Sequence, residues 1–310
     1  MTKNPVAPLS QEVVQDLLKE IASGSHLLSF SLLPGSFSNS TYIVKARLAN
    51  GSDFKFVVRR YAVFGDYDRG EKARREFKTF EYLHQYGIPA PEPLHLDDKG
   101  TLLGTPGIVT RFVPGRLMMS TPANPLDWAR KLAVTLAKIH SIPCGADAQS
   151  FLLDANAEAT WFLKSDTAPG YMQTYQGGVE VWKVLHDAFP SLRTMPSGLV
   201  HIDYWSGNIL WHKNQISAVL DWEEAAYGDP VIDVAYARMN MVLMGLNQAA
   251  DDFLQIYESE MGCKVENLGF WELAAAVRPM IDPEEWKVAD TDGLDKNIFQ
   301  QFMTEARKKV

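Results

Sequence analysis

Two short segments carry four polar side chains whose types and order suit chemistry on a phosphate group. Residues 199–210 read LVHIDYWSGNIL, and residues 218–223 read AVLDWE. Amide and carboxylate oxygens bind Mg²⁺, which usually takes one or two protein ligands and leaves its other positions to phosphate and water. A further carboxylate in the same place can accept a proton from a hydroxyl. His201, Asp203, Asn208 and Asp221 therefore indicate a site for phosphoryl transfer.

The spacing of these residues predicts a β-hairpin. The apolar, β-branched runs 208–212 and 216–222 are separated by three polar residues, which is typical of a hairpin turn. With the turn centred on Asn214 and Gln215, Asn208 falls opposite Asp221, and opposed Cβ atoms lie about 4.5 to 5.5 Å apart. We expect this pair to share one Mg²⁺, while Asp203, in the preceding loop, is free to face the metal and act as a base.

The order His, any residue, Asp, four residues, Asn and a later Asp is that of a kinase catalytic loop and its metal-binding Asp. Together with LDWEEAAYGDPVIDVAY at 220–236, it makes the chain resemble the aminoglycoside phosphotransferase and choline kinase-like family. The resemblance implies that Asp203 is the catalytic base and that Asn208 and Asp221 are the magnesium ligands. It also implies that His201 supports the loop.

The resemblance has one local departure, at Ile202, where the family most often has Gly. It implies an α+β, protein kinase-like fold with two lobes, and a length of 310 residues with 46% apolar residues suits such a division. Pro114 and Gly115 mark the break. We expect residues 1–113 to form a nucleotide-binding N-lobe with an antiparallel sheet and a helix. Residues 114–310 are expected to form a mostly helical C-lobe with the catalytic loop and the acceptor site.

Composition narrows the class of protein. Cys144 and Cys263 are the only cysteines, in no metal-ligand spacing, so we expect inert thiols in a reducing cytoplasm. The N-terminus lacks the apolar core of a signal peptide, and no run approaches the length of a membrane span. A net charge of -8 argues against general nucleic-acid binding. A cytoplasmic enzyme without a membrane or nucleic-acid partner is expected.

The first half of the chain supplies nucleotide-binding candidates. In the family, the loop before the second strand often reads Gly, small residues, Asn and Tyr, which implies that Gly35 and Ser36 contact phosphate. Strand alternation in FKFVVRRY, residues 54–61, places Val57 and Arg59 on one face. We expect Arg59 to face the nucleotide phosphates and Val57 the adenine.

The helix expected from about Arg69 to Tyr86 carries one inward acidic residue. Glu76 shares a stripe with Phe80 and Leu83, whereas Glu71 does not. Glu76 is therefore expected to pair with Arg59, although Arg75 or Lys78 could be its only partner.

A hinge is predicted where the strand at 107–113 runs into Pro114. Adenine would hydrogen-bond the backbone near Arg111, Phe112 and Val113, and Thr110 would line the back of the pocket. The resemblance implies Mg²⁺ as cofactor and ATP or GTP as donor, because a hinge that binds through its backbone does not choose between them.

The run from Asp221 to Asp229 is too short for the activation segment with which a protein kinase docks a peptide. A small-molecule hydroxyl acceptor is therefore expected, and the family spans aminoglycosides, macrolides, choline, amino acids and sugars. The aromatic and acidic residues near the site suggest a cationic or sugar-like alcohol. These acceptor candidates are Tyr204, Trp205, Trp222, Glu223 and Glu224.

Helices are predicted over 11–22, 125–140, 229–243 and 294–307 from apolar periodicity and caps. Asp229 is expected to begin the third of these, while Asp233 could brace the catalytic loop or bind solvent. The alternative function is a nucleotide-binding pseudokinase with a regulatory role, which Arg59 and the glycine-poor loop favour and the intact base and metal positions oppose.

Overall fold

A computed structural model of the chain describes residues 7–33, 39–62, 69–284, 286 and 293–310. Two compact units are present: Met1–Pro114 with Ser217–Glu223, and Gly115–Ile216 with Glu224–Val310. The sequence placed residues 217–223 in the second lobe. They group with the first unit because the Val219 N–H donates to the Pro89 carbonyl at 2.8 Å and the Trp222 N–H donates to Glu76 at 3.1 Å.

The first unit is built on a five-stranded antiparallel sheet in the order β1-β2-β3-β5-β4. Gly51, at φ 84°, occupies the turn between β2 and β3, a conformation that glycine adopts without steric cost. The strands are β1 (His26–Leu32), β2 (Ser40–Arg47), β3 (Asp53–Arg60), β4 (Pro93–Asp97) and β5 (Gly107–Arg111).

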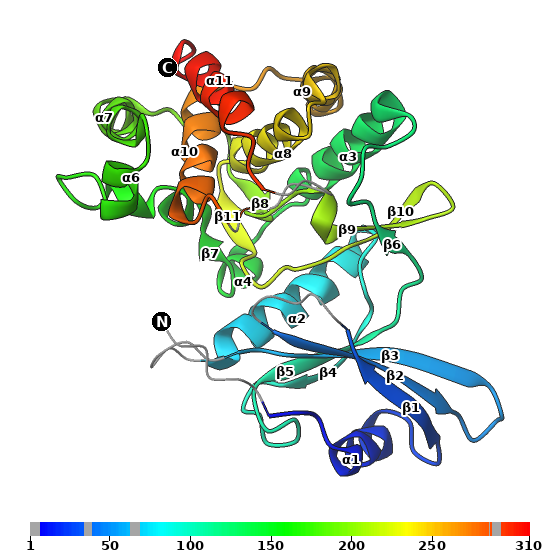
Figure 1. Cartoon of the computed structure of the whole chain (residues 1–310). Helices are drawn as coiled ribbons and strands as arrows, with labels where there is room; N and C mark the ends of the chain where they lie inside the picture. The colour runs from blue at the N-terminus through cyan, green and yellow to red at the C-terminus, as the bar shows by residue number, and fades with distance from the viewer. Residues whose placement is uncertain (1–6, 34–38, 63–68, 285, 287–292) are drawn as a thin grey trace. The chain divides into compact units, whose positions relative to one another are not determined.

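Helix α1 (Gln11–Ile21) packs its apolar stripe on the sheet (Figure 1). Ser10 caps it by accepting a hydrogen bond from the Val13 N–H at 3.2 Å, and this helix agrees with the prediction for residues 11–22. Alternate side chains of β2 and β3 enter the same core, Val44, Phe56 and Val58 among them.

Helix α2 (Arg69–Gln85) ends before Gly87, which has a φ of 67° and forms the expected left-handed cap. The helix packs against β4 and β5. Arg59 of β3 points to the same side as Glu76 of α2, whereas Arg60 points the other way and donates to the Leu103 carbonyl at 2.9 Å. The predicted alternation along β3 is confirmed.

The second unit is mostly helical, and its central helix is α8 (Val231–Leu243), nearly all of which is buried. Helix α8 packs against α9, α10 and α11, and α3 packs against α9 (Figure 1). The other helices are α3 (Pro125–His140), α4 (Ala146–Gln149), α5 (Ala155–Ala159), η1 (Trp161–Leu163), α6 (Gly170–Thr174), α7 (Gly178–Ala188), η2 (Phe189–Ser191), η3 (Ser206–Asn208), α9 (Asn247–Met261), α10 (Leu268–Ile281) and α11 (Lys296–Arg307).

Short strands frame the segments that carry the candidate site. One sheet has the order β7-β11-β8 and the other has the order β10-β9-β6. Their bounds are β6 (Arg116–Leu117), β7 (Leu153–Asp154), β8 (Gly198–Val200), β9 (Ile209–His212), β10 (Gln215–Val219) and β11 (Ala226–Gly228). The α+β class predicted from the sequence is confirmed. The assignment of nucleotide and acceptor binding to the two units stays a prediction.

None of the helices in the described part of the chain combines the length and the apolar character that crossing a membrane requires.

Candidate active site

The loop between β8 and η3 is held by one buried carboxylate. Asp233 of α8 accepts the N–H groups of His201 and Ile202, each at 2.7 Å, on its two oxygens. His140 of α3 contacts the same carboxylate at 3.1 Å. Of the two roles left open for Asp233, bracing the loop is the one that the structure shows.

Ile202 adopts a left-handed backbone conformation, with φ at 74°. This conformation costs an L-residue roughly 1–2 kcal/mol, and it is especially unusual for a β-branched side chain. The side chain is nonetheless 3% exposed and packs in the core of the second unit. The position at which the family most often has Gly is therefore strained here, next to the candidate base.

Asp203 is a partly exposed carboxylate whose two oxygens have different partners. Oδ1 lies 3.2 Å from Nη1 of Arg278, and Oδ2 accepts the Asn208 side-chain amide at 2.8 Å. The Asn208 amide also donates to the Asp203 carbonyl at 2.9 Å. Because the amide nitrogen faces Asp203, the amide oxygen of Asn208 points away from it and can accept a cation.

His201 is fully buried. Its Nδ1 accepts the Asp203 N–H at 3.3 Å, and its ring lies edge-on to Tyr204. The geometry gives His201 a supporting position, as the resemblance implied, and its contribution to catalysis stays a prediction.

The hairpin register predicted from the sequence is wrong. Lys213 and Asn214 occupy the turn, both with positive φ, so its centre lies one residue earlier than expected. Strand β9 begins after Asn208, and β10 ends at Val219, two residues before Asp221. Asn208 and Asp221 therefore lie outside the paired strands, and strand opposition is not a reason for them to share an ion.

In the first unit, Arg59 lies among three carboxylates. Its Nη1 is 3.3 Å from Glu76 Oε1, and its Nη2 is 2.9 Å from Glu223 Oε2 and also contacts Asp221. The predicted pairing of Arg59 with Glu76 is confirmed. Lys72 binds the other oxygen of Glu223 at 2.7 Å.

This cluster shifts the pKa of two carboxyls in opposite directions. Burial raises the pKa of Glu76 to about 7, against the charge of Arg59 and with the help of Asp221. Burial would also raise the pKa of Glu223, but Arg59 and Lys72 outweigh it and lower that pKa to about 2. Glu223 is therefore the firmly ionised member of the cluster.

The hinge residues expected to bind adenine already use part of their backbone. The Arg111 N–H donates to the Glu92 carbonyl at 2.8 Å, and the Phe112 N–H donates to the Lys55 carbonyl at 3.2 Å. Hydrogen bonding of a nucleotide base by this part of the backbone, Val113 included, stays a prediction. Thr110 is buried and Val57 half-buried, and their contact with a nucleotide stays a prediction. Gly35 and Ser36 lie outside the described residues.

Three of the five acceptor candidates do not suit that role. Tyr204 is fully buried, and its hydroxyl donates to the Leu132 carbonyl at 3.0 Å. Trp222 is also fully buried, and its indole N–H donates to the Val219 carbonyl at 3.2 Å. Glu223 belongs to the Arg59 cluster, so we assign these three to packing and charge balance.

The other two candidates keep some exposure. Trp205 is half-buried, and its ring lies so close over Gly207 that a Cβ there would come within 2.2 Å of it. Glu224 is 45% exposed and lies 3.5 Å from Arg278. Neither lines the pocket that opens beside the loop.

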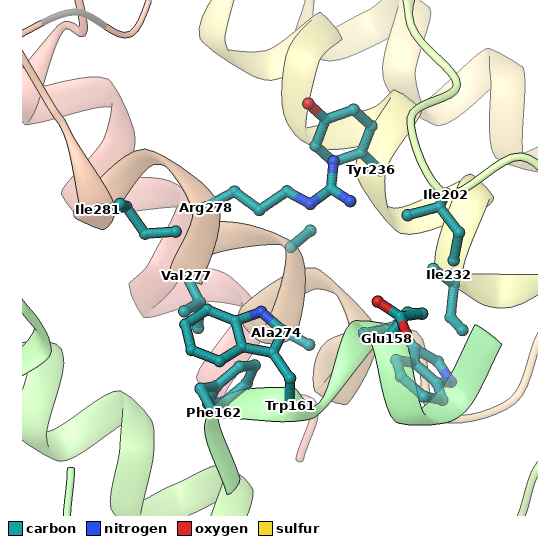
Figure 2. A pocket seen from close by; sticks show the side chains of 13 residues that line it. Glu158, Trp161, Phe162, Ile202, Ile232, Tyr236, Ala274, Val277, Arg278 and Ile281 are labelled. Atoms are coloured by element: carbon teal, nitrogen blue, oxygen red, sulfur yellow. The ribbon is translucent and has the colours of Figure 1, made fainter. Parts of the chain in front are cut away.

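That pocket is formed by α5, η1, α8 and α10 in the second unit, and its empty space is about 430 Å³ when the open solvent at its mouth is included (Figure 2). Its apolar lining includes Trp161, Phe162, Ile202, Ile232, Trp271 and Val277, and its polar lining is Glu158, Tyr236 and Arg278. Ile202, Tyr236 and Arg278 adjoin Asp203, so a ligand in this pocket can reach the candidate base.

Sequence reasoning missed Arg278. Its guanidinium lies 5.0 Å from the centre of the Tyr236 ring, and Figure 2 shows the side chain reaching toward that ring. Burial opposes its charge, but Tyr236, Asp203 and Glu224 raise the pKa of Arg278 above its ordinary value. A signal was present, because Arg278 is a charged residue at the end of the apolar run LAAAV, where charges are seldom buried without a partner.

The donor set for a divalent cation is chemically suitable. An amide oxygen on Asn208 and a carboxylate on Asp221 match the oxygen ligands that Mg²⁺ takes from proteins. Across the described residues, no three His, Cys, Asp or Glu side chains gather into a metal cluster.

These features define a class. A five-stranded antiparallel sheet with a buried Arg–Glu pair, followed by a helical unit with an Asp on a braced loop, is the architecture of protein kinase-like phosphotransferases. The phosphotransferase enzyme family model matches residues 29–264. The chain belongs to this family.

Individual proteins are also similar to the chain in sequence. The chain is 28% identical over 227 residues to homoserine kinase from Gluconobacter oxydans, covering 69% of this chain and 66% of that protein. It is 29% identical over 222 residues to acyl-CoA dehydrogenase family member 10 from Mus musculus, covering 64% of this chain. That match spans only 19% of the mouse protein's length.

Solved structures share the fold. A spectinomycin phosphotransferase with ADP and spectinomycin bound has a TM-score of 0.65 at 12% identity, covering 96% of this chain and 94% of that one. A macrolide 2'-phosphotransferase from Brachybacterium faecium has a TM-score of 0.60 at 18% identity, covering 87% of this chain and 90% of that one. At these identities the likeness concerns the fold.

Proposed function

We propose that this phosphotransferase moves the γ-phosphate of a magnesium nucleotide, ATP or GTP, to a hydroxyl group of a small molecule. The observation that carries the proposal is Asp203, a partly exposed carboxylate fixed by Asn208 and Arg278 at the edge of a pocket. The solved relative with bound ADP supports a nucleotide donor, and homoserine kinase, by its name, acts on a hydroxy amino acid.

The chain's residues would divide the work as follows. Asp203 accepts the proton of the acceptor hydroxyl, whose oxygen forms a bond to the γ-phosphorus as the bond to the β-phosphate oxygen breaks. Arg59, released in part from its carboxylates, neutralises phosphate charge. Magnesium, held by Asn208 and Asp221, would supply further neutralisation of the phosphates. Positioning and electrostatics provide most of the rate in such reactions.

The first prediction tests the base. Asp203→Asn keeps the shape and the hydrogen bond from Asn208 but cannot accept a proton, so kcat should fall about 10²–10⁴-fold. Turnover is measured with Mg-ATP and Mg-GTP over a panel of hydroxyl compounds. The control is Asp187→Asn, at a side chain that is 84% exposed, and it should keep the wild-type rate.

Two results count against the proposal. An Asp203→Asn enzyme that turns over an identified acceptor at the wild-type rate removes Asp203 from the role of base. Nucleotide binding by the wild type without transfer to any acceptor favours the alternative, a regulatory pseudokinase.

A further inference from the structure

The pocket beside Asp203 has a chemical character that differs from the one expected of a polycationic acceptor. Its walls are largely apolar and aromatic, with Trp161, Phe162 and Val277 close together on one side and Ile202 and Ile232 on the other (Figure 2). Glu158 is its one acidic lining residue and is solvent-exposed. Ammonium groups of a polyamine-like sugar would lose water here without gaining enough carboxylates to replace it.

Arg278 is the positively charged residue that lines the pocket. The Arg278 side chain is 31% exposed and lines the pocket, and its position is set by Asp203 at 3.2 Å and by the Tyr236 ring. Its second carboxylate partner, Glu224, is 45% exposed and lies at 3.5 Å. That contact is weak, and an incoming carboxylate can replace it at the guanidinium. A planar guanidinium binds carboxylates in a two-pronged geometry.

We propose that the acceptor is a hydroxy acid, with Arg278 binding its carboxylate and the apolar wall binding the rest of its carbon chain. This inference rests on the proposed function and names the substrate class of the same site. Arg278 touches Asp203, so the hydroxyl and the carboxylate must lie within a few bonds of each other at one end of the acceptor. β- and γ-hydroxy acids with an aliphatic or aromatic tail meet this condition.

The test compares molecules that share a carbon chain and a hydroxyl group and differ in the group that would face Arg278. The probes are a β-hydroxy acid with an aliphatic tail, its primary amide and the corresponding amino alcohol, each used as acceptor with Mg-ATP and the full chain. The wild type should prefer the acid over the amide by about tenfold or more in kcat/KM, because a charge-assisted bidentate contact is worth that much. The amino alcohol should be the poorest acceptor.

The variant Arg278→Gln should lower the acid-to-amide ratio of kcat/KM by about 10- to 100-fold. The ratio is the informative quantity, because a loss of Asp203's partner would slow both acceptors equally and leave it unchanged. Arg278→Lys keeps the charge but not the two-pronged geometry and should give an intermediate ratio. The control Arg130→Gln removes another ion-paired arginine, 2.9 Å from Asp127, and should keep the wild-type ratio.

Binding measured without nucleotide separates this inference from the proposed function. Preference of the wild type for the acid over the amide, lost in Arg278→Gln, supports the hydroxy-acid site even where no phosphate is transferred. That combination contradicts the transfer function alone. Transfer with a preference for the amide or the amino alcohol, or an unchanged ratio in Arg278→Gln, overturns the hydroxy-acid inference and leaves the transferase standing.

Discussion

At the scale of single residues, Ile202 is a position where a glycine variant should be more stable than an alanine variant, the reverse of the usual order. Ile202→Ala loses buried packing, worth about 2–5 kcal/mol, and keeps the left-handed strain. Ile202→Gly loses similar packing but recovers roughly 1–2 kcal/mol of strain. Glycine should therefore be the more stable of the two variants, by about 0.5–1 kcal/mol in urea unfolding.

The matched control for Ile202 is Val200, two residues earlier in β8, which is fully buried and pairs with Ala226. There the usual order should hold, with Val200→Ala more stable than Val200→Gly, because an extended strand gives glycine no steric advantage. A glycine variant at Ile202 that is less stable than the alanine variant would remove strain from the account of this loop.

The partner of a charged residue could be predicted from the sequence where helix or strand periodicity determines it. It could not be predicted where tertiary packing brings distant residues together. Glu76 was found because helical spacing turns it inward, toward a strand whose alternation is also readable. Tyr204 and Trp222 were misassigned because an aromatic residue near a catalytic motif looks the same whether it packs or binds. Arg278 lies 75 positions from Asp203 along the chain, and no local pattern links the two.

At the scale of elements, α8 acts as the support of the catalytic loop. Asp233→Asn leaves one acceptor oxygen where two N–H groups need one each, and it turns an amide NH₂ toward a donor. We expect a loss of about 2–3 kcal/mol in unfolding free energy and a fall in kcat, with little change in the KM for nucleotide. Thermal unfolding and steady-state kinetics on one preparation measure both.

Asp166→Asn is the control for Asp233, since Asp166 is exposed in the segment between η1 and α6. It should match the wild type in stability and in rate. An Asp233→Asn enzyme with normal stability and a normal kcat would show that the loop keeps its shape without this carboxylate.

Helices could be predicted from the sequence where the periodicity of apolar residues is strong. Helices α1, α2 and α3 agree with their predicted ranges to within about two residues at each end. The β9–β10 turn was misplaced because Lys213, Asn214 and Gln215 are all polar, and only the backbone shows which two take positive φ. A two-residue turn with positive φ at both positions matches the twist of the two strands in a hairpin. The turn therefore forms at Lys213 and Asn214, and the register differs from the predicted one.

At the scale of the whole molecule, the net charge of -8 conceals how unevenly charge is distributed. Arg59 and Lys72 share three carboxylates in the first unit, and Arg278 shares two in the second. Each arginine thus holds acidic groups in place before any ligand binds. A phosphate near the first, or a carboxylate near the second, would compete with those acidic groups for the same guanidinium.

This crowding predicts how stability depends on pH. Burial, opposed by Arg59 and reinforced by Asp221, raises the pKa of Glu76 from 4.5 to about 7, so the folded chain takes up a proton that the unfolded chain has released. The resulting stability is present below pH 4.5 and is lost as pH rises through 7. Urea unfolding in magnesium-free buffer should show the contribution of Glu76 to the free energy of unfolding falling by about 1–3 kcal/mol between roughly pH 5 and pH 8.

Two variants test this pH dependence. Glu76→Gln, which cannot ionise, should flatten the slope of unfolding free energy against pH, whereas Glu71→Gln, at an exposed position in the first turn of α2, should keep it. Equal slopes in the wild type and in Glu76→Gln would show that Glu76 keeps the same protonation in both states, and that Arg59 alone balances its neighbours.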